Sequence, residues 1–332
     1  MTLRIFIAGG YGIVGSAIAR HIRKVSKDIE IVLAGRNPDH GTALALELGN
    51  ARTALLDLKN LDGLDDLAQY DLIVASLQDP ADFLIQAALD KGIAHIGITK
   101  LADEIAPLAI AAWRTKPQRP IVPLGHSQSG VMTLVALKAA ESFSRIDSIN
   151  LAGLYDDREL MGPVTIGDAE GFIGRALLRK DGKWVWVDAS KHQRNVLLAD
   201  GSHLEGLPMG LLDTISLAAA TGAPNVRFDF IQGESIETRA RGQASQDLYI
   251  EIEGILKSGL PAKRRTGFNC LRRWCPWIRL SHGSRSSECG CLTIHEIVYV
   301  VTKAKFLSVI SEKFGFLYFV FLDVVFAELT SP

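Results

Sequence analysis

A cluster of glycines close to the start of the chain is the feature that most restricts its fold. The apolar run Ile5–Ile7 predicts a strand, and the segment Val14–Val25 beyond the glycines has apolar residues at helical spacing. Between them, Gly10, Gly12 and Gly15 form a G-x-G-x-x-G turn. In a strand-turn-helix unit this spacing lets the backbone turn tightly, approach a pyrophosphate and bring the helix close to the strand. The sequence therefore predicts a dinucleotide site formed by Gly9, Gly10, Tyr11, Gly12, Ile13, Val14 and Gly15.

Residues 1–125 continue as an alternation of short apolar runs and amphipathic segments. A parallel sheet is expected from this pattern, because a helix carries the chain back between successive parallel strands. The expected strands after the first are 29–34, 51–56, 71–75, 94–98 and 120–124, and the expected helices after the first are 38–48, 81–90 and 102–113. We interpret residues 1–125 as a Rossmann-type nucleotide-binding domain.

The end of the second predicted strand bears on which nucleotide binds. Arg36 and Asn37 follow this strand. A site for NAD usually has an Asp or Glu here, which bonds the ribose 2′-hydroxyl, whereas an arginine accommodates a 2′-phosphate. A guanidinium can hold phosphate through two parallel hydrogen bonds. Arg36 therefore favours NADP(H) over NAD(H); the alternative is a solvent-exposed arginine with no ligand.

The ends of the third and fourth strands outline the rest of the predicted site. Open parallel sheets bind ligands in the crevice beyond the carboxyl ends of their strands. Asp57 and Leu58 follow the third strand, and we expect them beside the adenine. Ser76, Leu77 and Gln78 follow the fourth strand and are expected to line the same crevice.

Four segments of the first domain carry a family resemblance. They read GGYGIVG at the start, LAGRN after the second strand, LDL after the third, and DLIVASLQDP followed by AALDKGIAHIGIT. Together they resemble the saccharopine dehydrogenase-like reductases over about the first 130 residues, and more loosely up to about residue 260. The resemblance implies a Rossmann domain for NAD(P), a mixed α+β domain for substrate and dimerisation, and a homodimer. The segment His95–Thr99 lacks the tyrosine and aspartate that the family often has there, which argues against saccharopine as the substrate.

Residues 126–260 show a different order of elements. The expected strands are 148–155, 193–198, 226–231 and 246–252, with two short strand-like runs at 176–178 and 183–187, and the expected helices are 131–142 and 208–220. Strands that follow one another with few helices indicate a mixed or antiparallel sheet covered by helices on one face. The predicted fold class is therefore a doubly wound parallel α/β sheet followed by an α+β domain for substrate and dimerisation.

Three residues are candidates for catalysis. His126 follows the last strand of the nucleotide domain and can donate or accept a proton, although a histidine in a glycine-rich loop is often a turn or packing residue. Lys100 follows the fifth strand and is either a substrate-carboxylate ligand or acid, or a surface lysine. Tyr155 ends a predicted strand and is expected to line the pocket. The sequence has no metal-spaced cluster of ligands and no P-loop, so we expect no metal.

The composition changes after about residue 260. The segment 261–332 contains all four cysteines of the chain and a dense set of arginines. The cysteines lack the paired C-x2-C spacing of structural zinc sites. The apolar run Phe314–Ala327 is shorter than the roughly twenty residues that a membrane helix needs. We interpret 261–332 as an atypical, divergent or frame-altered segment and expect it to be the least ordered part of the chain.

Charge and targeting signals narrow the class of partner. The formal net charge of −1 gives no indication of a nucleic acid or an anionic membrane as partner. The N-terminus has no signal-peptide pattern, so we expect a cytoplasmic protein with a small-molecule substrate.

Two functions are weighed on the sequence, and a third, a membrane-attached protein anchored by its tail, rests on Phe314–Ala327 alone. One is an NADP-dependent oxidoreductase that moves a hydride between NADP(H) and a small, amino-acid-like carbonyl or imine. The other is an NADP-binding sensor, or a truncated homologue, without turnover. A complete second domain favours the enzyme, whereas the lack of a convincing acid-base residue favours the sensor.

Overall fold

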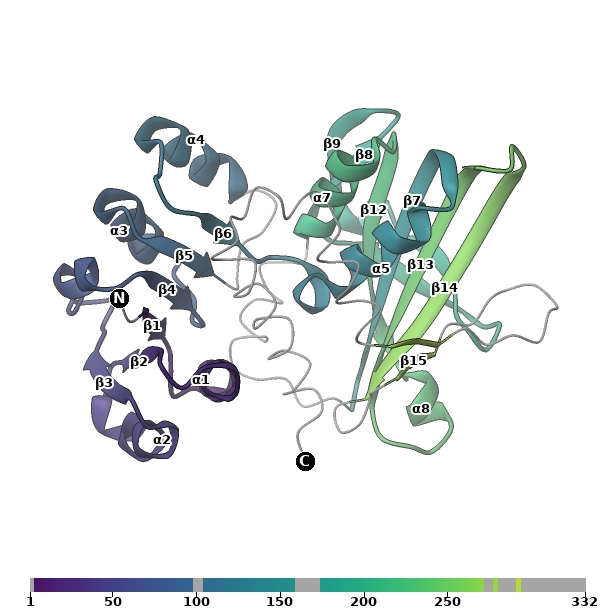
Figure 1. Ribbon diagram of the computed structural model, residues 1–332. Coiled ribbons are helices and arrows are strands. Elements are labelled where there is room, and N and C mark those ends of the chain that lie inside the picture. Colours follow the sequence, from purple (N-terminus) through teal and green to yellow (C-terminus); the bar gives the residue numbers. More distant parts are fainter. Residues whose placement is uncertain (1–2, 98–103, 159–173, 272–276, 280–290, 294–332) are drawn as a thin grey trace. The chain divides into compact units, whose positions relative to one another are not determined.

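The computed structural model describes residues 3–97, 104–158, 174–271, 277–279 and 291–293. These residues divide into two compact units, the first ending at Gly125 and the second beginning at His126 (Figure 1). Each unit is built on a large sheet of its own. The doubly wound parallel sheet and the α+β domain that we predicted are therefore both confirmed.

The sheet of the first unit has six parallel strands in the order β3-β2-β1-β4-β5-β6. Its strands are β1 (Arg4–Ala8), β2 (Glu30–Gly35), β3 (Ala51–Leu55), β4 (Leu72–Ala75), β5 (Ala94–Gly97) and β6 (Ile121–Pro123). Its helices are α1 (Ile13–Val25), α2 (Thr42–Leu48), α3 (Phe83–Lys91) and α4 (Ile105–Thr115). The strand order reverses between β1 and β4, which is the point where a doubly wound sheet opens a crevice for a ligand.

Both faces of this sheet are buried. Alternate residues of β1, Phe6 and Ala8, pack in one apolar cluster with Leu84 and Ala88 of α3. The intervening residues, Ile5 and Ile7, have no exposed surface either. On the sides of the sheet, α1 packs beside α2 and α3 beside α4 (Figure 1). Burial on both faces explains why the strands read as continuous apolar runs rather than as alternating patterns.

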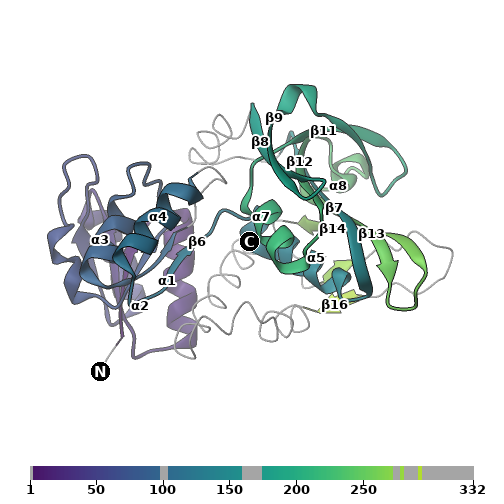
Figure 2. The ribbon, with the colours of Figure 1, turned by 90° about the horizontal axis from the view of Figure 1, so that it is seen from above.

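The second unit contains an eight-stranded mixed sheet, seen from above in Figure 2. The main path is β10-β11-β12-β7-β13-β14, and β8 and β9 lie off it. The strands are β7 (Phe143–Asp156), β8 (Arg175–Lys180), β9 (Lys183–Asp188), β10 (Arg194–Leu197), β11 (His203–Pro208), β12 (Asn225–Gly233), β13 (Ser245–Leu256) and β14 (Pro261–Leu271). The central pair β12 and β7 is parallel and the other pairings are antiparallel.

Helices cover one face of this sheet, as we predicted for an α+β domain. The helix α5 (Val131–Ala140) packs against β7 and β13, and α7 (Leu212–Thr221) packs against β12. A short third helix, α8 (Ile236–Arg239), precedes β13. On the opposite face, Ala152, Leu154 and Ile231 pack against Val196 and Leu198 of the β10–β11 region.

Several boundaries differ from the prediction for local reasons. The helix expected over 38–48 is a 3-10 turn over Pro38–Gly41 followed by α2. The helix expected from Pro208 begins at Leu212, because Pro208 ends β11 and is paired with Asp229. The strand expected over 148–155 extends from Phe143 to Asp156, since pairing with β12 and β13 supports polar residues that sequence alone does not mark as strand.

The second sheet also extends beyond residue 260. β14 pairs with β13 along its whole length, from Ser245 opposite Leu271 to Ile255 opposite Pro261. Its basic residues Lys263 and Arg265 form ion pairs with Glu251 on β13. The arginine-rich composition at the start of the segment 261–332 thus belongs in part to a regular edge strand. A short pair of strands, β15 (Trp277–Arg279) and β16 (Cys291–Thr293), is described beyond it.

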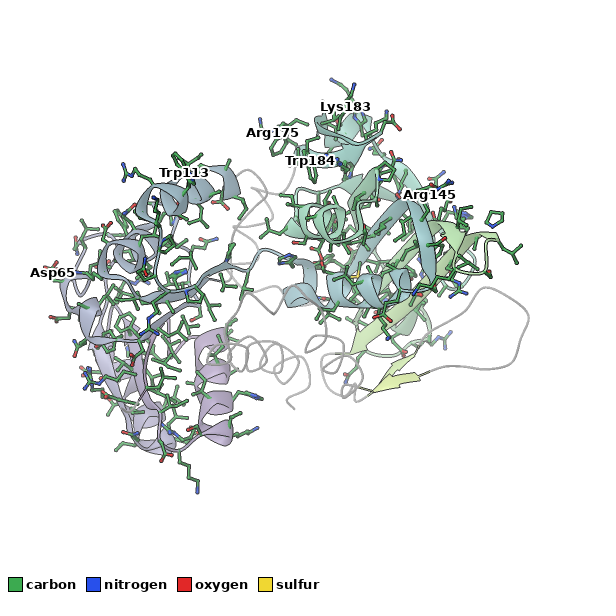
Figure 3. The ribbon with its side chains drawn as sticks, turned by 45° about the horizontal axis from the view of Figure 1, so that its top comes forward. Asp65, Trp113, Arg145, Arg175, Lys183 and Trp184 are labelled. Carbon is green, nitrogen blue, oxygen red and sulfur yellow. The ribbon has the colours of Figure 1, made fainter. Side chains whose placement is uncertain are left out.

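The hairpin of β8 and β9 presents aromatic residues outward. Trp184 and Trp186 are 43% and 42% exposed. The guanidinium of Arg179 stacks on Trp184 at 5.0 Å, and that of Arg175 stacks on Trp186 at 4.1 Å. Arg175 and Trp184, one member of each pair, are labelled in Figure 3. Each ring is therefore partly covered by an arginine of the neighbouring strand, a favourable cation–π arrangement.

Within the described residues, we find no helix with the length and apolar character needed to cross a membrane. The apolar run Phe314–Ala327 lies outside the described residues.

Candidate functional site

The glycine turn after β1 is built by close backbone approaches. Gly9 and Gly10 donate their N–H groups to Ala34 O on β2, at 2.8 and 3.2 Å. A Cβ on Gly15 would lie 2.2 Å from Gly9 O, and one on Gly10 would lie 2.8 Å from Leu33 Cα. Since both obstacles are backbone atoms, only glycine fits at these two positions, as the motif predicts.

The turn leaves the start of α1 open to an anion. Gly12 is the N-cap of α1, no side chain caps the helix, and its first turn contains no acidic residue. A Cβ on Gly12 would approach only Gly9 O, at 3.2 Å, among the described atoms outside its immediate neighbours. Ile13, the first residue of the helix, is 75% exposed. The N–H groups of the first helical turn and the positive end of the helix dipole therefore face an uncovered space that suits phosphate.

Arg36 stands at the end of β2, beside this turn in the sheet. Its side chain is exposed, and no ion pair or hydrogen bond holds its guanidinium within the part of the chain that the structure describes. The next residue, Asn37, donates its backbone N–H to Tyr11 Oη at 3.0 Å. The end of β2 is thus linked to the glycine turn by a side chain of the turn itself.

The ends of β1 and β4 meet at the same edge of the sheet. Ser76 Oγ donates to Ala8 O at 2.6 Å. A Cβ on Gly9 would lie 3.1 Å from Ser76 O and from Ser76 Oγ. Leu77 is half-buried against the apolar core of the first unit, and Gln78 is exposed. Ser76 therefore fixes the β4 end directly against the glycine turn.

The predicted adenine-side residues have local partners. Asp57 accepts hydrogen bonds from Lys59 N and from Asn60 Nδ2, both at 3.0 Å. Leu58 packs in part against the core cluster that includes Phe6. The Asp57 carboxylate thus stabilises the turn after β3, and Leu58 presents its remaining surface at the edge of the sheet.

A second group of polar residues lies at the start of the second unit. His126 Nε2 is 2.7 Å from Ser216 Oγ on α7. Asp213, one turn earlier on the same helix, has no exposed surface. Its carboxylate accepts hydrogen bonds from Ser127 N and from Thr133 Oγ1, both at 2.6 Å. Asp213 therefore anchors the backbone immediately after His126, while Ser216 holds the imidazole.

Burial shifts the pKa values of both titratable groups. It lowers the pKa of His126, and the nearby Asp213 offsets this only in part. It raises the pKa of Asp213, against the opposing effects of His126, Thr133 and Ser127 N. Both shifts favour the uncharged forms of the two groups, as burial away from water does in general.

Sequence reasoning did not select Asp213 or Ser216. Both are on one face of α7, three residues apart, but their partners come from the segment 126–133. The signal that could have found them is an aspartate within an apolar helix, since a buried carboxylate requires donors.

The comparisons with known proteins add evidence on the fold. No protein-family model matches the sequence, and no curated protein does. Among solved structures, saccharopine dehydrogenase (L-Glu forming) from Saccharomyces cerevisiae matches with a TM-score of 0.56 at 13% identity, over 98% of this chain and 97% of that chain. Our chain shares its fold.

Two further solved structures match over the whole length with lower scores. Levoglucosan dehydrogenase in complex with NADH has a TM-score of 0.49 at 14% identity, over 99% of this chain and 98% of that chain. Biliverdin reductase from Synechocystis, in complex with biliverdin and NADP+, has a TM-score of 0.47 at 11% identity, over 99% of both chains.

Two further residues, Lys100 and Tyr155, are candidates from the sequence. Lys100 lies outside the described residues. Tyr155 is half-buried near the end of β7, and its ring packs against Phe230 with centroids 5.1 Å apart. Among the described residues, no group of three or more His, Cys, Asp or Glu side chains could hold a metal ion.

Proposed function

We propose that this chain is an NADP-dependent oxidoreductase of the saccharopine dehydrogenase-like kind. Its reaction would transfer a hydride between NADP(H) and a small, amino-acid-like carbonyl or imine. The observation that carries the proposal is the combination of an uncapped α1 N-terminus with an Arg36, at the end of β2, that has no partner among the described residues. The first suits a pyrophosphate and the second a ribose 2′-phosphate.

The residues present fit a nicotinamide dinucleotide. The main chain from Gly9 to Gly15 would hold the pyrophosphate, and Arg36 with Asn37 the adenosine ribose. Asp57 and Leu58 would border the adenine, and Ser76, Leu77 and Gln78 would line the crevice at the end of β4. When bound, the cofactor supplies or accepts the hydride, and the protein orients it and excludes water.

His126 is the proton-transferring residue of this proposal. Its neutral imidazole, held by Ser216 and stationed directly after the last strand of the nucleotide unit, can accept a proton as a hydroxyl or amine is oxidised. Tyr155 and Lys100 stay predictions for the substrate pocket. We expect His126→Gln to lower turnover by about 100-fold while leaving the Kd for NADPH within twofold. Ser216→Ala serves as the matched control and should lower turnover far less.

Tryptophan-fluorescence titration with NADPH and NADH tests the cofactor. We expect NADPH to bind at least tenfold more tightly, and Arg36→Asp to remove that preference. Equal affinity for the two nucleotides, with no effect of Arg36→Asp, would contradict the role given to Arg36.

Turnover is tested by following NADPH oxidation with imino acids, keto acids and enones. An enzyme should consume NADPH with at least one of these classes. Tight NADPH binding with no turnover on any class would instead support the alternative, an NADP-binding sensor or inactive homologue.

A further inference from the structure

Tyr11, between the first two glycines of the motif, joins the glycine turn to the end of β2. Its hydroxyl oxygen accepts the backbone N–H of Asn37 at 3.0 Å. Its ring lies over two glycines: a Cβ on Gly35 would be 2.2 Å from Tyr11 Oη, and one on Gly41 would be 2.7 Å from Tyr11 Cδ1. The half-buried phenol thus occupies the space that side chains at both positions would need.

Before Arg36, the chain is held in the sheet, where Gly35 O accepts from Leu56 N at 3.0 Å. The residues after Arg36 are held in part by bonds among themselves. Asn37 Oδ1 accepts from Asp39 N at 3.3 Å, and Asn37 Nδ2 lies 3.2 Å from His40 Nε2. His40 N donates to Asn37 O at 3.2 Å. Within the described chain, these bonds keep the segment folded but do not attach it to the glycine turn. The Tyr11 hydroxyl attaches it to the turn by a hydrogen bond, and the Tyr11 and His40 rings add an edge-to-face contact with centroids 6.4 Å apart.

This arrangement affects how Arg36 can meet a ligand. An exposed, unpaired arginine loses side-chain entropy when it orders around a phosphate. The loss in affinity is smaller when the backbone that carries the side chain is already fixed. The hydrogen bond to Asn37 N fixes the peptide immediately after Arg36, at the point where the chain leaves β2.

We propose that Tyr11 determines cofactor specificity by positioning Arg36, through the hydrogen bond from Asn37 N to its hydroxyl. The inference rests on the proposed function, in which Arg36 binds the 2′-phosphate of NADP(H). Tyr11 acts on the phosphate only through the Arg36 backbone, so it is a positioning residue. The adenosine half of the cofactor without its 2′-phosphate would gain nothing from the bond.

The test uses two small probes, 2′,5′-ADP and 5′-AMP, which differ in the 2′-phosphate. Their binding to the full chain is measured by isothermal titration calorimetry. Tyr11→Phe keeps the ring over Gly35 and Gly41 and removes only the hydroxyl. We expect its affinity for 2′,5′-ADP to fall about fivefold, the effect of one hydrogen bond, and its affinity for 5′-AMP to stay within twofold. A thermal melt verifies that the variant is folded.

A double-mutant cycle with Arg36→Gln gives a readout that a merely structural role would not produce. If Tyr11 acts through Arg36, Tyr11→Phe should have no further effect on 2′,5′-ADP binding once Arg36 is replaced. Equal losses for both probes, an unchanged affinity for 2′,5′-ADP, or additive effects in the cycle would overturn the inference.

The failure of the cofactor proposal has a different signature. If the wild-type chain bound the two probes equally and Arg36→Gln changed neither affinity, the proposed function and this inference would both fall. If Arg36→Gln removed the preference for 2′,5′-ADP and Tyr11→Phe did not alter it, only the inference would fall.

Discussion

The two units of the molecule bury their polar groups in different ways. In the described residues of the first unit, His95 is the one polar side chain classed as buried. Among the described residues of the second unit, five buried side chains carry a carboxyl group: Asp156, Asp213, Asp229, Asp247 and Glu251. Buried carboxylates must be paired with donors or cations, so each requires partners elsewhere in the chain. The first unit is therefore encoded by apolar runs and glycines, and the second by long-range side-chain pairs.

Asp229 illustrates the second kind of encoding. Its carboxylate has no exposed surface and lies between the guanidinium groups of Arg194 and Arg227. Arg194 comes from β10 and Arg227 from β12 itself. Such a cluster fixes the position of an edge strand against the centre of the sheet, but no short motif identifies it. The polar clusters of this unit therefore cannot be identified from the sequence and become apparent only in the folded structure.

Gly15→Val tests whether the fold of the first unit depends on its glycines. The new Cβ would lie 2.2 Å from Gly9 O, a backbone atom that cannot move without breaking the turn. We expect a loss of about 3 kcal/mol in the free energy of unfolding, measured by denaturant titration, together with the loss of nucleotide binding. Gly12→Ala is the matched control, because its Cβ would lie 3.2 Å from the same oxygen. Equal stability losses in the two variants would refute the packing argument.

Asp213 offers a comparable test in the second unit. Asp213→Ala leaves Ser127 N–H and the Thr133 hydroxyl buried without their acceptor, which we expect to cost about 2 to 4 kcal/mol of unfolding free energy. Asp213→Asn should cost clearly less, since the amide oxygen can accept from Ser127 N and the Thr133 hydroxyl can turn to accept from the amide. Denaturant titration distinguishes the two. An alanine variant as stable as the asparagine variant would mean that these bonds contribute little.

The pH dependence of unfolding tests the contribution of a third buried carboxylate, Asp156, to the stability of the fold. Burial acts to raise the pKa of Asp156, but hydrogen bonds from Ser235 and the Arg158 N–H lower it to about 2. A carboxyl whose pKa is lower in the folded state stabilises the fold above its unfolded value, about 3.9, and loses this contribution as the pH falls toward 2. The second unit should therefore lose about 2 kcal/mol from Asp156 between pH 4 and pH 2.

Urea titrations across this pH range, followed by the intrinsic fluorescence of the chain's tryptophans, Trp184 and Trp186 of the second unit among them, measure that loss. Asp156→Asn should have a flatter pH profile than the wild type, whatever its absolute stability. Asp157→Asn, which changes the exposed neighbour, should keep the wild-type slope. Parallel profiles for wild type and Asp156→Asn would exclude this contribution.

The smallest effect is expected at the ion pairs of β14. Burial acts to raise the pKa of Glu251, but the hydrogen bonds from Lys263 and Arg265 lower it overall. Both cations are about half exposed, so solvent and salt screen the interaction. We expect Glu251→Gln to cost less than about 1 kcal/mol at low salt, and the difference to shrink at high salt. Glu253 also pairs with Lys263 but is more exposed than Glu251, so Glu253→Gln should leave the free energy of unfolding almost unchanged.

The sequence predicts the first unit well because its information is local. The turn from Gly9 to Gly15 and the strand end at Arg36 each depend on neighbours in the chain or on adjacent parallel strands. Tyr11 was expected beside the nucleotide, but its bond to Asn37 N depends on how the two strand ends meet. That bond could not be deduced from the spacing of the motif.

The second unit was predicted only in class. The alternating strands indicated a mixed sheet, yet the sequence did not select Asp213 as the partner of Ser127 and Thr133. The start of the segment after residue 260 was not predicted as a strand for a related reason. Lys263 and Arg265 form ion pairs with Glu251 on β13, a partner that the composition of the segment does not reveal. Periodicity and composition describe local stretches of sequence, so they do not predict which distant residues pair.

The position of β14 at the end of the second sheet has a consequence for synthesis on the ribosome. All six strands of the first sheet precede Gly125, so that sheet can assemble early. The second sheet is centred on β7, whose partners β12 and β13 are made much later, and its edge is covered only when Leu271 has emerged. Nascent chains thus carry β7 with both edges unpaired from the completion of Asp156 until β12 is made, an interval in which aggregation or chaperone binding competes with folding.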